Sequence, residues 1–342
     1  MAHGRTGVLL LNLGTPDSPQ PRDVRRYLRE FLSDPRVIDL PAVPRWLLVH
    51  LVIAPFRPRR ASAAYRKIWG PDGSPLLVHG RALCAAVEKQ LGDGYAVVLG
   101  MRYGQPSIPS ALERLVTADV DQILALPLFP QWAESSTGSA IARLESAADA
   151  LPHAPPVESL PPFFDDPGFL GAFAERARPA LAEAKPEHVL FSYHGLPERQ
   201  IRAADPSGRH CLSDDACCEN PGESLPRCYR AQCYATSAGL AGALGLGPTE
   251  HSTAFQSRLG RTPWIRPYTD HVLPELAAQG VRRLAVLCPS FVADCLETLE
   301  EIGIRGREQW EGLGGEILSL VPCPNAHPRW VEAVAAMVRR SA

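Results

Sequence analysis

Short apolar runs alternate with segments of helical periodicity along almost the whole chain, and this alternation restricts the fold more than any other feature. The apolar runs occupy residues 7–13, 95–101, 122–128, 188–193, 250–256, 283–288 and 316–321. Helical spacing of apolar residues occurs at 21–32, 76–91, 107–116, 135–151, 167–184, 225–244, 269–279, 292–309 and 326–340. Strands that alternate with helices in this way form βαβ units and parallel sheets. The pattern therefore predicts an α/β protein.

The alternation restarts after a proline-rich stretch at residues 151–165, which we interpret as a linker. The sequence thus predicts two Rossmann-like halves with parallel sheets, at residues 1–155 and 156–325, and a cleft between them. The last segment, 326–342, is expected to be a helix that packs back on the first half. A cleft between two such halves is the default place for a ligand.

Bulk composition excludes some classes of protein. The chain has 342 residues with a formal net charge of -2, which does not suggest nucleic-acid binding. No apolar run reaches the roughly 18–20 residues of a membrane span, and the N-terminal residues lack the apolar region of a signal peptide. These features predict a cytoplasmic protein, in which the nine cysteines are expected to be thiols, metal ligands or cluster ligands rather than disulfides.

His194 is the first candidate for chemistry. It follows the buried strand predicted at 188–193 and precedes the loop Gly195-Leu196-Pro197. In open α/β sheets, ligands bind at the carboxyl ends of strands, and an imidazole there can bind a metal or accept a proton. A structural histidine that is hydrogen-bonded in a loop is the alternative.

An acidic helix face is the second candidate. Glu297 and Glu301 are four residues apart in the predicted helix, so their carboxylates share one face, and Asp294 is expected to share it in part. Such a face could guide a divalent cation or accept protons. The alternative is a solvated acidic face near a helix N-terminus.

A polar, cysteine-rich insert follows His194, at residues 205–228. Its thiols, and one just beyond it, are Cys211, Cys217, Cys218, Cys228 and Cys233. A polar loop without a core of its own needs a cross-link, which a zinc ion or an iron–sulfur cluster would supply. The spacing does not choose between these two, and unliganded thiols are the remaining alternative.

Two further segments suggest ligand or membrane contact. Apolar residues at 38–60 end beside Arg57, Arg59 and Arg60, a combination that suits a membrane surface or an apolar anionic ligand. The alternative is a helix packed on the core with a solvated basic end. Trp264 lies in an arginine-flanked loop, which would suit a large, flat, anionic ligand.

Taken together, these motifs resemble the ferrochelatase family, which inserts ferrous iron into a porphyrin at the end of haem synthesis. The matching segments, in family order, are 11–16, 73–76, 101–103, 135–138, 191–197, 256–258 with 263–264, and 294 with 297–301. The resemblance covers nearly the whole chain.

The resemblance implies two chelatase-type halves that hold a porphyrin in their cleft. It assigns His194 as the catalytic histidine and Glu297 as the group facing it across the macrocycle, both as ligands of the Fe²⁺ substrate, with Glu301 next along an acidic path. The implied substrate-binding residues are Leu13, Ser74, Met101, Arg102, Tyr103 and Trp264. Leu13 stands where coproporphyrin-using relatives carry a tyrosine, which favours protoporphyrin IX.

The cysteines depart from the animal-type pattern of this family. That pattern needs a cysteine at the position of Glu134 and three more in a C-terminal tail, and here the tail ends Arg339-Arg340-Ser341-Ala342. Some bacterial relatives carry a cluster in an internal segment, which favours a 2Fe-2S cluster over structural zinc here. The ligands implied are Cys211, Cys217, Cys218 and Cys228, with Cys233 as an alternate.

The predicted function is therefore insertion of Fe²⁺ into protoporphyrin IX with release of two protons. The alternatives are a chelatase for coproporphyrin III, a cobalt or nickel chelatase, and a non-catalytic iron–sulfur sensor on a chelatase fold. The predicted partners are the porphyrin, a peripheral contact with the inner face of the cell membrane and a second copy of the chain, with no nucleic acid.

Overall fold

The computed structural model describes residues 4–260 and 262–342, which form two compact units. The first unit comprises Met1–Phe129, Glu134–Pro162 and Val331–Ala342, and the second comprises Pro130–Ala133 and Phe163–Trp330. Two predictions concern residues outside these ranges. The predicted absence of a signal peptide involves residues 1–3, and the arginine-flanked sequence around Trp264 includes Arg261.

A four-stranded parallel sheet forms the centre of the first unit. Its strands are β1 (Thr6–Thr15), β2 (Tyr95–Gly104), β3 (Gln122–Pro127) and β4 (Val157–Ser159), in the order β2-β1-β3-β4. Val8–Leu11 of β1 are completely buried, as expected for a central strand covered on both faces. The short strand β4 lies in the stretch that we predicted to be a linker.

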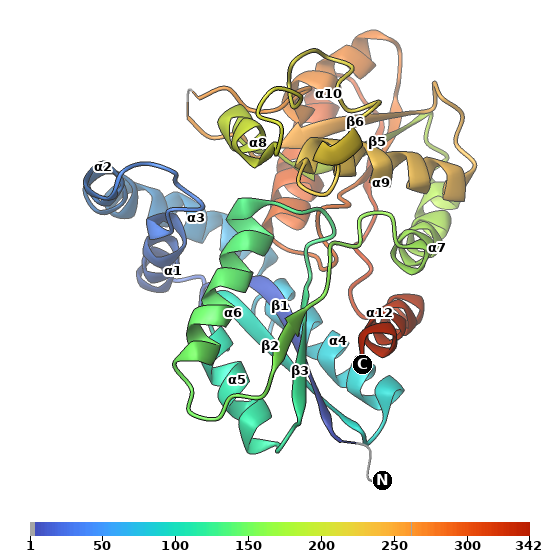
Figure 1. Ribbon diagram of the computed structural model, residues 1–342. Helices are drawn as coiled ribbons and strands as arrows, with labels where there is room; N and C mark the ends of the chain where they lie inside the picture. Colours follow the sequence, from blue (N-terminus) through green and yellow to red (C-terminus); the bar gives the residue numbers. More distant parts are fainter. Residues whose placement is uncertain (1–3, 261) are drawn as a thin grey trace. The chain divides into compact units, whose positions relative to one another are not determined.

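Helices cover both faces of this sheet (Figure 1). Leu9 and Leu11 pack in one cluster with α5 (Ile108–Thr117) and α6 (Ser139–Asp149). On the other face, Leu99 lies against Gly80 of α4 (Pro75–Leu91). The other helical segments of this unit are α1 (Pro21–Ser33), α2 (Ala42–Leu47), η1 (Leu48–Ile53), α3 (Ala54–Ile68) and η2 (Glu134–Gly138).

The second unit repeats the same sheet. Its strands β5 (His188–His194), β6 (His251–Gln256), β7 (Arg283–Leu287) and β8 (Ile317–Leu320) are parallel and have the order β6-β5-β7-β8. Counted within its own unit, each sheet therefore has the strand order 2-1-3-4. This repetition confirms the predicted α/β class and the two Rossmann-like halves.

Helices also flank the second sheet. They are α7 (Pro167–Ala184), α8 (Glu198–Ala204), η3 (Gly222–Ser224), α9 (Tyr229–Leu244), α10 (Thr269–Ala278), η4 (Glu297–Gly306) and α11 (Arg307–Gly312). The last helix, α12 (Pro328–Ser341), begins in the second unit, and its residues from Val331 onward belong to the first.

The order 2-1-3-4 creates a topological switch point between the first and third strands of each unit. Ligands of open α/β sheets bind beyond the carboxyl ends of the strands at such a point. In the second unit the two strands are β5, which ends at His194, and β7, which continues into Cys288-Pro289-Ser290. The fold therefore places His194 at the ligand-binding edge of its sheet.

One predicted helix begins later than its periodicity suggested. We expected a helix from Val292, but η4 begins at Glu297, and its turns are those of a π-helix. The Asp294 carboxylate is buried and accepts hydrogen bonds from the Cys323 N–H (3.1 Å) and the Asn325 side-chain amide (2.7 Å). These bonds hold residue 294 outside the helix, so the prediction that Asp294 shares the acidic face is wrong.

None of the helices within residues 4–260 and 262–342 is both long and apolar enough to cross a membrane.

Candidate active site and cysteine site

His194 ends β5 with its side chain partly exposed, opposite Gln256 at the end of β6. Its Nδ1 lies 2.7 Å from the carbonyl oxygen of Gly195. Because a carbonyl can only accept, Nδ1 carries a proton and donates it to this bond. In the neutral ring the remaining lone pair is then on Nε2, which is the nitrogen available for a proton or a metal ion.

Trp264 lies beside the loop that follows His194. A Cβ atom on Gly195 would lie 2.8 Å from the Gln256 carbonyl oxygen and 3.3 Å from the Trp264 ring. Only glycine permits this approach without displacing backbone. The indole N–H donates to the carbonyl of Leu259 at 2.9 Å, which fixes the orientation of the ring. The structure thus places Trp264 against Gly195, the residue that follows His194.

The first turns of η4 are tied to the end of β6. The Gln256 side chain donates from Nε2 to the Glu297 carbonyl oxygen at 2.8 Å and accepts from the Ser192 hydroxyl at 2.7 Å. The Glu301 carboxylate accepts from the backbone N–H (2.9 Å) and the hydroxyl (2.6 Å) of Ser257. These bonds hold the acidic helix at the sheet edge that carries His194.

The environment of Glu301 favours a proton on its carboxyl group. Burial raises its pKa, and the nearby charge of Glu297 adds to this effect. The Ser257 hydrogen bond and the positive charges of His194 and Arg305 act in the opposite direction, but the net result is a raised pKa. His194 and Glu297 therefore both lie near enough to Glu301 to affect its carboxyl group, and a carboxyl group in this state can exchange protons with a neighbouring imidazole.

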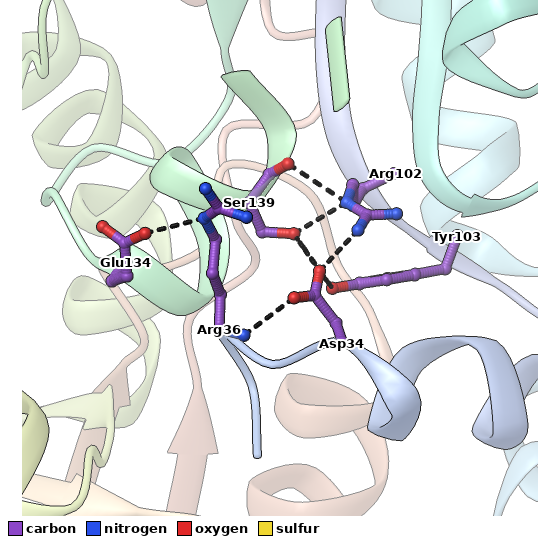
Figure 2. Close-up of polar contacts among 6 residues, drawn as sticks. All are labelled: Asp34, Arg36, Arg102, Tyr103, Glu134 and Ser139. Atoms are coloured by element: carbon purple, nitrogen blue, oxygen red, sulfur yellow. Dashed lines mark hydrogen bonds and ion pairs between the residues drawn. The ribbon is translucent and has the colours of Figure 1, made fainter. Parts of the chain in front are cut away.

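Two of the predicted residues of the first unit, Arg102 and Tyr103, lie in a polar cluster, which Figure 2 shows. Asp34, just after α1, accepts hydrogen bonds from Arg102, Tyr103 and Ser139. Arg102 also donates from Nε to the Ser139 hydroxyl at 2.7 Å. Sequence reasoning missed Asp34 and Ser139. The available signal was a single acidic residue at the end of the helix predicted at 21–32.

Burial differs among these predicted substrate-binding residues. Met101 and Tyr103 have no exposed surface, and Ser74 is 3% exposed and bonded to the Thr15 hydroxyl at 2.8 Å. Leu13 and Arg102 are partly exposed. Met101, Tyr103 and Ser74 are therefore interior residues of this unit, whereas Leu13 and Arg102 present atoms at its surface.

The four cysteines of the insert lie together. The sulfurs of Cys217 and Cys218 are 3.9 Å apart, and the thiol of Cys228 lies near enough to those of Cys218 and Cys211 to change their pKa values. Cys233 instead lies fully buried against Tyr229. The first four thiols thus form one connected set, which we call the cysteine site.

Asp205 and Arg230 organise the cysteine site. The Asp205 carboxylate accepts from the N–H groups of His210 (2.7 Å) and Cys211 (2.9 Å) and from the Ser224 hydroxyl (2.9 Å). Burial acts to raise its pKa, but these hydrogen bonds lower it well below the usual range of an aspartate. Arg230 is 9% exposed and donates to Cys218 Sγ at 3.4 Å, so a buried positive charge stands beside the sulfurs.

The thiols of the cysteine site differ in pKa. Burial raises the pKa of Cys211, and the neighbouring Cys228 thiol raises that of Cys218. The Cys218 thiol, and hydrogen bonds from N–H groups at the start of α9, lower the pKa of Cys228 despite its burial. The separation of 3.9 Å between two sulfurs is close to the ~3.8 Å expected between ligands of a tetrahedral site with metal–sulfur bonds of about 2.3 Å. Within the described part of the chain, no group of three or more His, Cys, Asp or Glu side chains already has the arrangement of a metal site.

Comparison with solved structures identifies the class of the fold. The sirohydrochlorin chelatase SirB from Bacillus subtilis subspecies spizizenii, solved in complex with cobalt, is similar with a TM-score of 0.56 and 11% sequence identity. The similarity covers 99% of this chain and 95% of that one. The protein therefore has a chelatase-type fold, with His194 at the carboxyl edge of its second sheet.

Sequence comparison identifies the family. Residues 5–342 match the ferrochelatase family model. The chain is 48% identical to a ferrochelatase of Coxiella burnetii (strain Dugway 5J108-111), over 99% of this chain and 94% of that one. It is 49% identical to a ferrochelatase of Legionella pneumophila (strain Lens), over 98% of both chains. The chain belongs to the ferrochelatase family, and it is an enzyme of haem biosynthesis that inserts iron into a porphyrin.

The Asp34 cluster leads to a prediction about stability. Asp34→Asn should lower the free energy of unfolding at pH 7 by about 3 kcal/mol, because Arg102 loses its buried partner. Burial acts to raise the pKa of Asp34, but the bonds from Ser139, Arg36 and Tyr103 and the charge of Arg102 lower it overall. Because the pKa of Asp34 is lower in the folded state, its carboxylate contributes full stability at pH values above the pKa of an unfolded aspartate, about 3.9. This contribution is lost as the pH falls toward the pKa of Asp34 in the folded state.

Urea unfolding at several pH values tests this prediction. The difference between wild type and Asp34→Asn should be largest near neutral pH and should narrow below about pH 4. Asp23→Asn is the control, since Asp23 forms a partly exposed ion pair with Arg26 and should change stability by less than about 1 kcal/mol. Equal stability of wild type and Asp34→Asn at pH 7 would contradict the prediction.

Proposed function

We propose that this protein inserts Fe²⁺ into protoporphyrin IX and releases the two pyrrole N–H protons. Leu13 favours this porphyrin, because coproporphyrin-using relatives carry a tyrosine at the corresponding position. In the first unit, Leu13 and Arg102 are the proposed contacts of the porphyrin, and Met101, Tyr103 and Ser74 are proposed to frame it. In the second unit Trp264 is proposed as an aromatic wall.

The proposed chemistry requires two deprotonations and one metal transfer. Nε2 of His194 is the proposed acceptor for a pyrrole proton, since Nδ1–H is already committed to the Gly195 carbonyl. Glu297 and Glu301 are proposed to supply oxygen ligands to the Fe²⁺ substrate and to carry protons away. His194 and Glu297 would hold Fe²⁺ briefly before the transfer, and the single Nε2 lone pair would accept a proton only after the metal has moved to the porphyrin. A site that holds the macrocycle out of plane would expose the nitrogen lone pairs, bringing the substrate closer to the transition state.

One observation carries this proposal. An imidazole with its lone pair on Nε2 lies within electrostatic reach of Glu301, a carboxyl group whose pKa is raised by burial. A proton acceptor beside a carboxyl group that favours its proton is an arrangement suited to proton transfer near neutral pH. A purely structural role, in which His194 only stabilises its loop, explains the Nδ1 hydrogen bond. It does not explain the nearby Glu297 and Glu301.

The first test removes the imidazole. His194→Ala should abolish insertion of Fe²⁺ or Zn²⁺ into protoporphyrin while porphyrin binding, measured by fluorescence quenching, changes little. His271→Ala is a control at the surface of α10, where the side chain contacts Arg258, and it should retain activity. Turnover by His194→Ala within about threefold of wild type would refute the assignment, since general acid–base catalysis contributes roughly 10²–10⁴-fold.

The same absorbance assay separates the alternative functions. Faster metalation of coproporphyrin III than of protoporphyrin IX would replace the proposed substrate. Insertion of cobalt or nickel without insertion of iron would indicate a different chelatase. No metalation of any porphyrin by a folded protein would favour the non-catalytic sensor.

We further propose that the cysteine site holds a 2Fe-2S cluster through Cys211, Cys217, Cys218 and Cys228, with Cys233 as an alternate ligand and structural zinc as the alternative occupant. The connected thiols, the buried Arg230 charge and the lowered pKa of Cys228 support this proposal. Metal insertion into a porphyrin transfers no electrons, so the proposed role is to cross-link the insert or to sense iron or oxidants. Cys233 is less suited, because it contacts Tyr229.

Spectroscopy tests the cysteine site. Anaerobically purified protein should show the visible absorption of a 2Fe-2S cluster and, after reduction, its EPR signal. Cys218→Ser should lose both signals and bound iron, whereas Cys84→Ser, in α4 of the first unit, should keep them. A colourless wild-type protein with one zinc ion per chain would refute the cluster and support zinc.

We also propose that the protein is cytoplasmic, pairs with a second copy of itself and touches the inner face of the cell membrane through α2, η1 and the start of α3. Apolar side chains on this segment are unusually exposed, with exposed fractions of 54% for Trp46, 57% for Leu51 and 76% for Phe56. The adjacent arginines at 57, 59 and 60 are also exposed. Apolar anchors beside cations favour anionic lipid surfaces.

Vesicle binding tests the membrane proposal. Charge reversal to Glu at Arg57, Arg59 and Arg60 should weaken co-sedimentation with vesicles that contain anionic lipid by at least tenfold, since each basic residue near such a surface contributes about 1 kcal/mol. Reversal of the exposed Arg81, Arg143 and Arg307 is the matched control and should have little effect. Equal weakening by both triple reversals, or by neither, would count against a specific membrane face.

A further inference from the structure

Tyr229 and Ser290 enclose the backbone of His194 in a closed set of hydrogen bonds. The Tyr229 hydroxyl lies 2.8 Å from the His194 carbonyl oxygen and 2.9 Å from the Ser290 hydroxyl. The Ser290 hydroxyl in turn lies 3.1 Å from the His194 N–H, which donates to it. Both backbone polar groups of His194 are therefore bound by these two side chains.

The direction of each bond follows from the groups involved. The Tyr229 hydroxyl has one proton, and the carbonyl of His194 can only accept it. The Ser290 hydroxyl must then donate to the Tyr229 oxygen while it accepts from the His194 N–H. The result is a ring of three bonds in one direction, in which each hydroxyl both donates and accepts, and such chains strengthen their members mutually.

Burial makes this ring costly to break. Tyr229 is 6% exposed, and burial raises its pKa well above the ordinary range, so its hydroxyl keeps the proton that it donates. Loss of that hydroxyl would leave the Ser290 hydroxyl and the His194 carbonyl, which are only partly exposed, without their partner. Such a change moves the backbone or costs free energy.

The same tyrosine is the residue next to a cysteine of the insert. Cys228 stands at the N-cap of α9, immediately before Tyr229, and its N–H donates to the Ser224 carbonyl at 2.7 Å. Its thiol contacts those of Cys218 and Cys211. One peptide bond therefore separates the cysteine site from Tyr229, and one hydrogen bond connects Tyr229 to the His194 backbone.

We propose that Tyr229, together with Ser290, is a positioning residue that holds His194 in its catalytic place and makes this placement dependent on the integrity of the cysteine site. The inference rests on the proposed role of His194. It adds a structural connection between the cysteine-rich insert and the catalytic histidine. This connection does not depend on a redox reaction of the occupant of the cysteine site.

Matched hydroxyl deletions test the positioning role. Tyr229→Phe and Ser290→Ala should each lower kcat about tenfold with little change in the KM for porphyrin, since small displacements of a catalytic group reduce rate more than binding. The controls are Tyr193→Phe and Ser237→Ala, which break another buried Tyr–Ser bond of 2.9 Å in the same unit. Melting temperatures of all four variants measure the general cost of losing such a bond.

The readout independent of activity is amide hydrogen exchange of the peptide that covers residues 189–196. Exchange at His194 should rise several-fold in Tyr229→Phe and Ser290→Ala, but not in the two controls. If Tyr229→Phe has the same kcat and the same amide exchange at His194 as the control Tyr193→Phe, the positioning role is overturned. If His194→Ala metalates porphyrin as the wild-type enzyme does, the role of His194 itself is overturned instead.

The dependence on the cysteine site is tested with Cys211→Ser, whose thiol contacts Cys228 but lies outside α9. In the wild-type background, Cys211→Ser should raise amide exchange at His194 and lower kcat. In the Tyr229→Phe background, the same substitution should change amide exchange and kcat by clearly smaller factors. Equal fold-changes in the two backgrounds, or no change in either, would overturn the connection. Cys217→Ser replaces Cys211→Ser if the latter does not fold, as judged by circular dichroism.

Discussion

The parallel pairing of β5 with both β6 and β7 is the constraint on which the second unit depends. Parallel strands bring their carboxyl ends to one edge of the sheet, so the loops after these three strands meet there. They deliver His194, the Gln256-Ser257 pair and Ser290, respectively. Each of these residues then bonds to a residue of another strand, loop or helix, and the site is built from contacts that no single segment could make alone.

The surroundings of Asp34 and Glu301 shift the pKa values of these two carboxyl groups in opposite directions. Asp34 is surrounded by donors, and its pKa is lowered, so it acts as a fixed negative charge that holds Arg102, Tyr103 and Ser139. Glu301 is bonded to Ser257 but dominated by burial and by the charge of Glu297, so its pKa is raised. Asp34 is therefore suited to a structural role, and Glu301 is suited to exchange protons.

The insert shows how a polar segment can become ordered without a hydrophobic core. Asp205 gathers backbone N–H groups and a hydroxyl, and Arg230 places a buried charge beside the sulfurs. The cysteine site is thus held from the side of the insert by Asp205 and from the side of α9 by Arg230. An occupant would add metal–ligand bonds to a scaffold that these contacts already organise.

Much of the fold could be predicted from the sequence, because buried parallel strands are continuous apolar runs and their helices keep a regular period. The seven strands predicted were all found, and β4 was missed because its three residues lie in proline-rich sequence. Local signals also identified His194, Glu297, Glu301 and the insert cysteines as candidates. The helix expected from Val292 failed because a distant residue, Asn325, holds Asp294 in another conformation.

The sequence by itself determined the α/β class, the repetition of two halves and the residue types available for metal and proton chemistry, since these depend on local periodicity and composition. Only the tertiary structure decided that Ser257 holds Glu301, that Asp34 holds Arg102, and that Tyr229 and Ser290 hold His194. These partners are 35 to 96 residues apart along the chain. Their contacts arise from the order of strands in the sheets, which local periodicity does not encode.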